Sequence, residues 1–432
     1  MTNPLDGFTV NRADIGYVGH ELQRPECILA EPDGTLWSAD ARGGVMRIAQ
    51  DGSQRFIGQQ ADARFGAAAS QDAEAVEQKF TTGTLPNGLA FAANGDILIS
   101  NFGTDVLEVM TRDGATRLLA DTIDGQPIGK VNFVLRDAQG RIWITVSTRM
   151  NPWTQAAGTR VRDGYVAVLD GTGLYVVADG FHFTNEIRLD AAGEWLYIVE
   201  TTGPHITRMR VDGTGARVRL TDREVFGPSH LGGFPDGIAF DAYGNLWCTL
   251  VMVDQLGPVS TMQGVAKVSR TCPSRRATQR VRPHAQGAQR GGAGSADLPF
   301  GLPRKGAVCG VARACKATAL LRSGALHTAP LRGNAIPLHS ANRPLALTPQ
   351  GDKRVLLDDG NPEPSQRLLD GMANGYVSPE SMLAARGSIA PWMASVTFGG
   401  PDLRTVYLGS LMGTRIPFFR APVAGLPLAH WH

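Results

Sequence analysis

The sequence predicts an all-β protein, a six-bladed β-propeller that carries one long basic insertion. Three observations favour this fold class: a strand–turn–strand pattern recurs along the chain, glycine is abundant, and the strand-like alternation stops in one stretch only. The 432 residues include 52 glycines and are 43% hydrophobic and 19% charged, so the chain can bury a large core. Many glycines stand in Asp-Gly and Asn-Gly pairs, which are typical of turn-rich β structure.

The repeated unit has five close copies, each with alternating apolar residues before a turn that ends in glycine. The copies begin at Glu26 (ECILAEPDGTLW), Asn87 (NGLAFAANGDIL), Asn132 (NFVLRDAQGRIW), Asn185 (NEIRLDAAGEWLY) and Asp236 (DGIAFDAYGNLW). In every copy the glycine stands eight residues after the opening residue. Alternation with a period of two, followed by a glycine turn, predicts a β-hairpin in each copy.

The spacing of the copies predicts propeller blades. Successive turn glycines are separated by 61, 45, 53 and 51 residues, which suits a four-stranded blade. A sixth copy, ASVTFGGPDLRTVYLGS, begins at Ala394. A propeller ring commonly closes by pairing strands from the two ends of the chain within one blade. Segments 8–18 (FTVNRADIGYV) and 414–422 (TRIPFFRAP) are the candidates for this closure.

The opening residue of each copy is expected to face the central channel, because the innermost strands of all blades line it. These residues are Glu26, Asn87, Asn132, Asn185, Asp236 and, in the sixth copy, Ala394. Two carboxylates and three amides form an oxygen-rich ring of the kind that Ca²⁺ prefers, and no His or Cys is present to favour zinc or copper. The alternative is that Asn and Asp only form turns here. Five polar residues at one repeat position argue against that alternative.

On these motifs the chain resembles the SMP-30/gluconolactonase family, the gluconolactonase/luciferin-regenerating-enzyme-like group of six-bladed propellers. The similarity runs from about residue 26 to 255 and resumes from about residue 345 to 431. Its motifs are PECIL with Glu26, GKVNFVLRDAQGRIW with Asn132, FTNEIRLD with Asn185, FPDGIAFDAYGNLW with Asp236, and the closing segment SVTFGGPDLRTVYLGSL.

The resemblance implies a lactonase, a carboxylic ester hydrolase that depends on a divalent cation. Ca²⁺ is the expected cation, with Zn²⁺, Mn²⁺ and Mg²⁺ as alternatives. The implied metal ligands are Glu26, Asn132, Asn185 and Asp236, and the implied catalytic residues are Asp236 and Lys130. Asn132 and Lys130 are also implied substrate contacts, and we assign Asn87, at a channel position that is less regular in the family, to substrate contact as well. Such a cation polarises the lactone carbonyl and stabilises the oxyanion that forms.

Two departures from the family pattern bear on the substrate. Cys27 stands where the family usually has Gly, and Lys130 stands where it often has Arg. Lys cannot reproduce the fork of an Arg, so lactone hydrolysis is a firmer expectation than a sugar lactone as substrate. Two alternatives remain: a phosphotriesterase or other ester hydrolase on the same metal site, and a metal-stabilised propeller that binds a ligand without turnover. His182 as a base and Arg149 on the channel rim are weaker candidates, since a packed strand residue and a solvated loop residue explain them more simply.

The predicted organisation has three parts: residues 1–256 for the blades up to the first part of the fifth, 257–343 for the insertion, and 344–432 for the remainder with the closing blade. Fourteen Lys and Arg against one acidic residue give the insertion a net charge of +13, whereas the whole chain carries +2. Its only aromatic residue is Phe300.

Three interpretations of the insertion compete. Binding of nucleic acid would use the basic charge, but stacking aromatics are nearly absent. A lid of this length and polarity would be disordered. The third interpretation is a stretch derived from a frameshift or an intron. We favour it because joining VMVDQ to PLALTPQGDKRVLLDDG restores an ordinary strand pair of the fifth blade.

The remaining sequence signals narrow the class of protein. MTNPLDGFTV lacks a basic segment followed by an apolar core, and no run of about 18 apolar residues occurs, so neither a secretory signal nor a transmembrane helix is expected. Five cysteines without C-x-x-C spacing argue against a disulfide framework and a structural zinc site. We therefore expect a soluble cytoplasmic protein that acts on a small lactone or ester, with no nucleic-acid or membrane partner.

Overall fold

The computed structural model describes residues 2–60, 83–157, 161–252, 342–373 and 379–431. The chain divides into two units, residues 1–261 together with 336–432, and residues 262–335. The second unit, and with it nearly all of the predicted insertion, lies outside the described residues. The fold below is that of the first unit.

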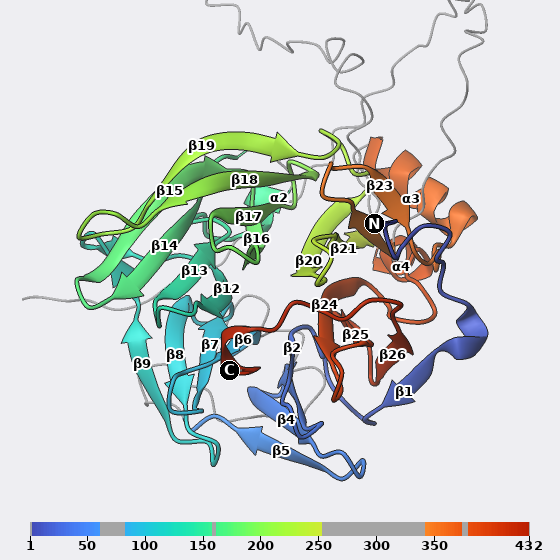
Figure 1. The fold of residues 1–432 in the computed structure, drawn as a ribbon, viewed down its shortest axis with the longest axis horizontal. Helices are drawn as coiled ribbons and strands as arrows, with labels where there is room; N and C mark the ends of the chain where they lie inside the picture. The colour runs from blue at the N-terminus through green and yellow to red at the C-terminus, as the bar shows by residue number, and fades with distance from the viewer. Residues whose placement is uncertain (1, 61–82, 158–160, 253–341, 374–378, 432) are drawn as a thin grey trace, which may run out of the picture. The chain divides into compact units, whose positions relative to one another are not determined.

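The described residues form six four-stranded antiparallel sheets arranged around a centre, which confirms the six-bladed propeller (Figure 1). The first three blades are β2 (Ile28–Ala30), β3 (Leu36–Asp40), β4 (Gly44–Ile48) and β5 (Gln54–Gly58); β6 (Pro86–Phe91), β7 (Ile97–Asn101), β8 (Val106–Met110) and β9 (Thr116–Ala120); and β12 (Val131–Arg136), β13 (Ile142–Val146), β14 (Gly164–Asp170) and β15 (Gly173–Phe181). The next two are β16 (Thr184–Leu189), β17 (Trp195–Glu200), β18 (His205–Asp212) and β19 (Arg219–Phe226); and β20 (Phe234–Phe240), β21 (Leu246–Met252), β22 (Arg343–Leu347) and β23 (Lys353–Val355). The sixth blade is β24 (Met393–Gly399), β25 (Thr405–Ser410), β26 (Ile416–Arg420) and β1 (Gly16–Val18).

The repeated glycines end the turns between the first two strands of each blade, as predicted. All five have a positive φ, between 67° and 97°: Gly34, Gly95, Gly140, Gly193 and Gly244. In each turn the glycine N–H donates to the carbonyl three residues before it. Glycine adopts this left-handed conformation without the steric cost that a side chain would add, so its place in the repeat is set by the backbone.

In two blades a hydrogen bond between side chains also stabilises this turn, and both blades have the sequence pattern Asp-x-x-Gly-x-x-Trp. The indole of Trp143 donates to Asp137 at 2.7 Å, and that of Trp247 donates to Asp241 at 2.9 Å. The same aspartates accept backbone N–H groups of their own turns. Both indoles are fully buried, so this hydrogen bond connects the turn to the core and satisfies a buried N–H donor.

The ring closes through the two segments that the sequence nominated. β1 pairs antiparallel with β26, with Gly16 opposite Phe418 and Val18 opposite Ile416. A Cβ on Gly16 would lie 2.5 Å from the Phe418 ring, so a larger residue would require that ring to move. The first and last parts of the chain therefore share one blade.

The fifth blade pairs strands from the two sides of the predicted insertion. β21 and β22 are antiparallel, with Leu246 opposite Leu347 and Leu250 opposite Arg343. This is the strand pair expected from joining the flanking sequences. β22 begins at Arg343, the last residue that the sequence assigned to the insertion.

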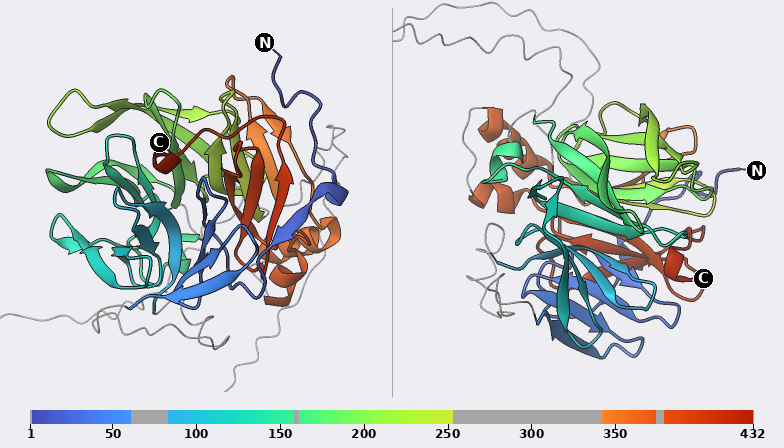
Figure 2. Two further views of the ribbon diagram at one scale, coloured as in Figure 1. Left: turned by 60° about the horizontal axis from the view of Figure 1, so that its bottom comes forward. Right: turned by 90° about the vertical axis from the view of Figure 1, so that its left-hand side faces the viewer.

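Short helices and one hairpin complete the described structure. They are η1 (Arg12–Asp14), β10 (Thr122–Ile123) with β11 (Gln126–Pro127), α2 (Thr154–Ala157), α3 (Pro362–Ala373), α4 (Pro379–Ala384) and η4 (Ala429–Trp431). α3 and α4 stand between the fifth and sixth blades and were not predicted from the sequence. Figure 2 places α2, α3 and α4 on one face of the propeller and the C-terminus on the opposite face. None of the described helices is long and apolar enough to cross a membrane.

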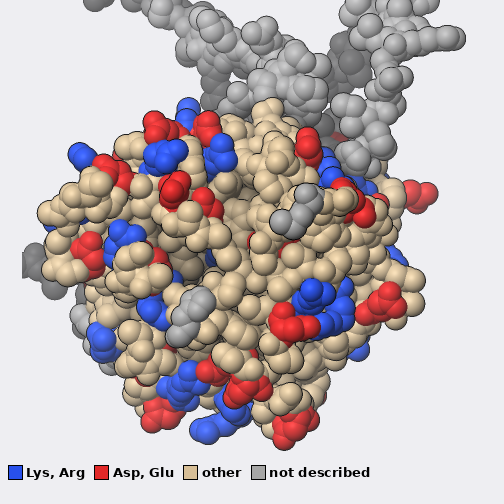
Figure 3. All heavy atoms as spheres, viewed as in Figure 1, with Lys and Arg blue, Asp and Glu red and all other residues tan. Residues whose placement is uncertain are grey.

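A pocket of about 530 Å³ opens beside the C-terminal segment. Its wall includes Arg136, Leu189 and Phe240, at the far ends of β12, β16 and β20, together with Trp431. On the face that Figure 3 shows, Lys and Arg are interspersed with Asp and Glu. The pocket lies at the ends of the inner strands, whereas the predicted site residues lie at their beginnings.

Candidate functional site

The five predicted ring residues lie at the beginning of the inner strands, and all are buried. Glu26 precedes β2, whereas the other four lie in β6, β12, β16 and β20, and their exposed fractions are 3–6%. Strand pairing shifts register around each of these four: between Pro86 and Leu89, Val131 and Phe133, Thr184 and Ile187, and Pro235 and Ile238. Bulges re-aim side chains, and here one falls at the ring position in four successive blades.

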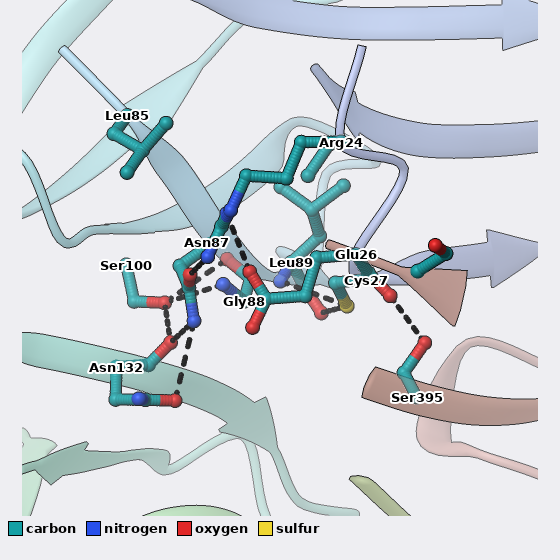
Figure 4. Close-up of polar contacts among 12 residues, drawn as sticks. Arg24, Glu26, Cys27, Leu85, Asn87, Gly88, Leu89, Ser100, Asn132 and Ser395 are labelled. Atoms are coloured by element: carbon teal, nitrogen blue, oxygen red, sulfur yellow. Dashed lines mark hydrogen bonds and ion pairs between the residues drawn. The ribbon is translucent and has the colours of Figure 1, made fainter. Parts of the chain in front are cut away.

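On one side of the ring the side chains form a connected polar network (Figure 4). The Arg24 guanidinium lies 2.5 Å from Glu26 Oε2 and donates to Asn87 Oδ1 at 2.7 Å. The Asn87 amide donates in turn to the carbonyl oxygen of Asn132 at 3.0 Å and to its Oδ1 at 3.2 Å. Three of the predicted residues, from three blades, are thus brought together, with an arginine that the sequence analysis did not nominate.

On the other side, Asn185 and Asp236 belong to neighbouring blades. Asn185 donates to the Thr201 hydroxyl at 3.3 Å, and that hydroxyl donates to the Pro235 carbonyl at 2.9 Å. Burial raises the pKa of Asp236 well above its usual range, and the nearby carboxylates of Glu26 and Glu186 raise it further. These electrostatic interactions place Asp236 in the same cluster as Glu26.

Glu186 is a third buried carboxylate, which acts electrostatically on Asp236, and it was not predicted. It accepts the Ile238 N–H at 3.1 Å and lies 3.0 Å from the Arg188 guanidinium. Burial raises its pKa to about 7, although Arg188 opposes the shift. The one sequence feature that could have identified Glu186 is its position directly after Asn185. Strict alternation puts consecutive residues on opposite faces, and the bulge at this point defeats that rule.

Arg24 was missed for a similar reason. It stands two residues before Glu26, outside any strand, with a left-handed φ of 54°. Its side chain is 8% exposed. Only the spacing Arg-x-Glu could have suggested that the two side chains meet, and no repeat pattern applies to a residue in this conformation.

Lys130 and Asn87, two of the predicted substrate contacts, both contact other protein groups. The Lys130 amine lies 2.7 Å from Asp105 and donates to the Phe102 carbonyl at 3.1 Å. These contacts tie it to the loop after β7, and none of them reaches Glu26 or Asp236. Asn87 uses both its oxygen and its amide in the network described above.

His182 and Arg149 lie in other surroundings. His182 Nδ1 is 2.9 Å from Glu200, which also contacts His205 at 3.3 Å. The exposed Arg149 stacks over the Tyr165 ring, with its guanidinium carbon 4.5 Å from the ring centre. The two residues belong to local contacts of the third and fourth blades.

Comparison with known proteins places the fold and the motifs in a family. Residues 24–281 match the SMP-30/Gluconolactonase/LRE-like region, more than half of the chain. The chain belongs to this family. Among curated proteins, the adipocyte plasma membrane-associated protein of Gallus gallus is 24% identical over 251 residues, which cover 54% of this chain and 55% of that protein. The match thus spans about half of the relative's length.

Solved structures of family proteins share the fold at low identity. A gluconolactonase from Xanthomonas campestris superposes with a TM-score of 0.51 at 13% identity, covering 97% of this chain and 94% of that one. The calcium-binding protein regucalcin from Agrobacterium tumefaciens gives 0.51 at 12% identity, with 96% of each chain covered. At this identity the likeness establishes the propeller fold.

The residues of the ring fit a hard divalent cation. Carboxylate oxygens of Glu26 and Asp236 and amide oxygens of Asn132 and Asn185 are donors that Ca²⁺ accepts. Burial and the neighbouring carboxylates disfavour the ionised form of Asp236 and raise its pKa, and a bound cation would offset that cost. Within the described ranges, no three His, Cys, Asp or Glu side chains gather as a metal cluster. A cation would therefore need the amide oxygens as well as the two carboxylates.

Proposed function

We propose that this chain is a divalent-cation-dependent hydrolase that opens a lactone ring, with Ca²⁺ as the cation. The observation that carries the proposal is the set of buried carboxylate and amide side chains at the beginning of five inner strands: Glu26, Asn87, Asn132, Asn185 and Asp236. The names of the gluconolactonase and the calcium-binding regucalcin among the structural neighbours support the lactone and the calcium.

The proposed chemistry divides between the ring residues. Glu26, Asn132, Asn185 and Asp236 would hold the cation, which polarises the ester carbonyl and stabilises the oxyanion. The Asp236 carboxylate would accept a proton from the attacking water, whose oxygen bonds to the carbonyl carbon. The ring C–O bond then breaks, and the proton passes to the leaving oxygen to give a hydroxy acid.

Lys130 and Asn87 are proposed as substrate contacts at the edge of this site. Asp105, the partner of Lys130, has a side chain that is 40% exposed, whereas the lysine side chain is 6% exposed. A substrate oxygen that takes the place of the aspartate would receive the Lys130 charge. We therefore assign Lys130 to substrate binding and to support of the developing negative charge.

A second candidate function is ligand binding without turnover. The Arg24 guanidinium already supplies a positive charge to Glu26, so part of the ring is compensated without any metal. A propeller of this kind would bind a cation or a ligand in the same place and leave lactones intact.

The test is hydrolysis by the full chain of a panel of aldonolactones and simple γ- and δ-lactones, followed by pH-stat. A phosphotriester is included, and each assay is run with added Ca²⁺ and after chelation. The matched variants are Asp236→Asn in the ring and Asp402→Asn in the exposed ion pair with Arg420. Turnover that needs Ca²⁺ and is lost only in Asp236→Asn supports the lactonase. Turnover of the phosphotriester alone supports the ester-hydrolase alternative, and cation binding without turnover supports the binding protein.

A further inference from the structure

Arg24 supplies a positive charge to the centre of the propeller from a position outside the repeat. The guanidinium lies 2.5 Å from Glu26 Oε2 and 2.7 Å from Asn87 Oδ1 (Figure 4). The side chains of Arg24 and Glu26 are 8% and 7% exposed, so water screens this pair little. A guanidinium stays protonated at every pH that the folded chain experiences. The positive charge at Glu26 is therefore permanent.

The backbone holds this side chain in place. Arg24 has a φ of 54°, an uncommon conformation for a residue with a side chain. The Glu26 N–H donates to the Arg24 carbonyl at 2.7 Å, which folds the segment tightly just before β2. The guanidinium and the Glu26 carboxylate therefore belong to one short turn, and their contact forms without closure of a long loop.

The guanidinium and a divalent cation would compete for the same carboxylate. Glu26, whose carboxylate is a ligand of the proposed metal site, contacts Arg24 through Oε2. Two positive charges held a few ångströms apart in a buried site repel strongly. A bound cation would consequently have to displace the guanidinium from Glu26, while Asn87 still offers the guanidinium a hydrogen-bond acceptor.

We propose that Arg24 is an internal counter-cation that holds Glu26 in the absence of metal and must release it before a cation can bind. This inference rests on the proposed metal site. It adds Arg24 as a residue that sets the affinity of that site for a cation. Arg24 acts through Glu26, so it is a positioning residue. Its presence stabilises the metal-free propeller and weakens cation binding by the same interaction.

The test is calorimetric titration of the full chain with Ca²⁺ and with Mn²⁺, for wild type, R24Q and R24K. R24Q removes the charge, and we expect its cation affinity to rise by at least about tenfold, since a buried pair no longer has to be broken. R24K keeps a charge but has no fork to hold Glu26 and Asn87 together, so its affinity is expected to lie between the two. Melting temperature supplies a second readout: R24Q should melt below wild type in chelator and gain more from added Ca²⁺.

The matched control is R42Q. Arg42 forms another buried ion pair, with Asp40, through contacts of 2.7 and 2.6 Å, and its loss should lower the melting temperature without a change in cation affinity. Wild-type binding with equal or weaker binding by R24Q overturns the inference and leaves the metal site in place. If neither protein binds a cation, the proposed metal site fails and the inference fails with it. Should R24Q not fold, R24K decides: tighter binding than wild type supports the inference, and equal or weaker binding overturns it.

Discussion

The two sides of the central ring differ in how their negative charge is compensated. Glu26 has a guanidinium at 2.5 Å and belongs to a network that reaches Asn87 and Asn132. Asp236 is equally buried, yet no Lys or Arg among the described residues forms an ion pair with it. Its pKa is raised by burial and by neighbouring carboxylates. Burial also raises the pKa of Glu26, although Arg24 opposes the shift. One carboxylate thus has a cation at ion-pair distance without metal, and the other does not.

This difference shows that burial alone does not decide what a carboxylate contributes. A buried charge with a partner is stabilising relative to the broken pair, whereas a buried charge among like charges costs folding free energy. Such a cost is retained where a ligand relieves it. The two carboxylates should therefore respond in opposite directions when each is replaced by its amide.

The largest effect is expected for Asp236→Asn. We expect the proposed lactonase activity to fall by at least about a thousandfold, because the variant lacks both the proposed base and a charged metal ligand. In chelator, the free energy of unfolding should rise by about 1 kcal/mol, because repulsion with Glu26 and Glu186 is removed. Initial rates by pH-stat and urea unfolding measure the two quantities. A variant that is both active and less stable than wild type would contradict the comparison.

The next largest effect is expected for Glu26→Gln. The substitution leaves the buried Arg24 charge without its carboxylate, so the free energy of unfolding in chelator should fall by about 3 kcal/mol. Urea unfolding beside Asp236→Asn measures the contrast directly. A shift of the two variants in the same direction would show that the two sides of the ring are electrostatically alike.

A smaller effect is expected away from the ring, at Glu200. Burial favours its protonated form, but hydrogen bonds with His205, Thr207 and the His182 N–H outweigh burial and lower its pKa. Burial likewise opposes the charge of His205, yet its pKa is raised by Glu200. The Glu200 contribution is present above its unfolded pKa of about 4.3 and is lost as the pH falls through its lower folded pKa. The His205 contribution is present below its unfolded pKa of about 6.5 and is lost as the pH rises through its raised folded pKa.

Both contributions therefore operate near pH 5.5. Glu200→Gln should cost about 2 kcal/mol of unfolding free energy at that pH and less at pH 8.5. Urea unfolding at the two pH values gives the comparison. His20→Gln, in an exposed contact with Gln54, serves as the control. An equal cost at both pH values would exclude the proposed charge linkage.

The smallest effect is expected for Lys130→Met. Because its amine pairs with Asp105 outside the carboxylate cluster, the substitution should raise KM about tenfold while cation affinity stays unchanged. Lactone kinetics and Ca²⁺ titration separate the two. Unchanged KM would remove Lys130 from the substrate site, and weakened Ca²⁺ binding would move it into the metal site.

Much of the fold was predictable because the repeat imposes the same local chemistry in each blade. The turn glycines are needed for their positive φ, and the pairing of β1 with β26 follows from the need to close a ring. Helices α3 and α4 were not predicted, since they stand between two blades and belong to no repeat. Periodic patterns identify the repeated strands but do not predict the segments that connect the blades.

The site was predictable only in part. The ring position was identified from one residue per blade, and the structure brings Glu26, Asn87 and Asn132 into one network and couples Asp236 to Glu26. The partners that set the charges of these residues were missed. Arg24 is 63 residues from Asn87 along the chain, and no local pattern predicts a contact of that range.

The sequence by itself determined the propeller and the closure of its ring. These properties depend on local periodicity and turn chemistry, which repeat along the chain. Only the tertiary structure decided that Arg24 and Glu186 join the ring. Arg24 has a left-handed backbone before β2, and Glu186 lies at a bulge in β16, so the alternation of a regular strand does not predict where either side chain points. Charges from separate blades become neighbours only when the ring has closed.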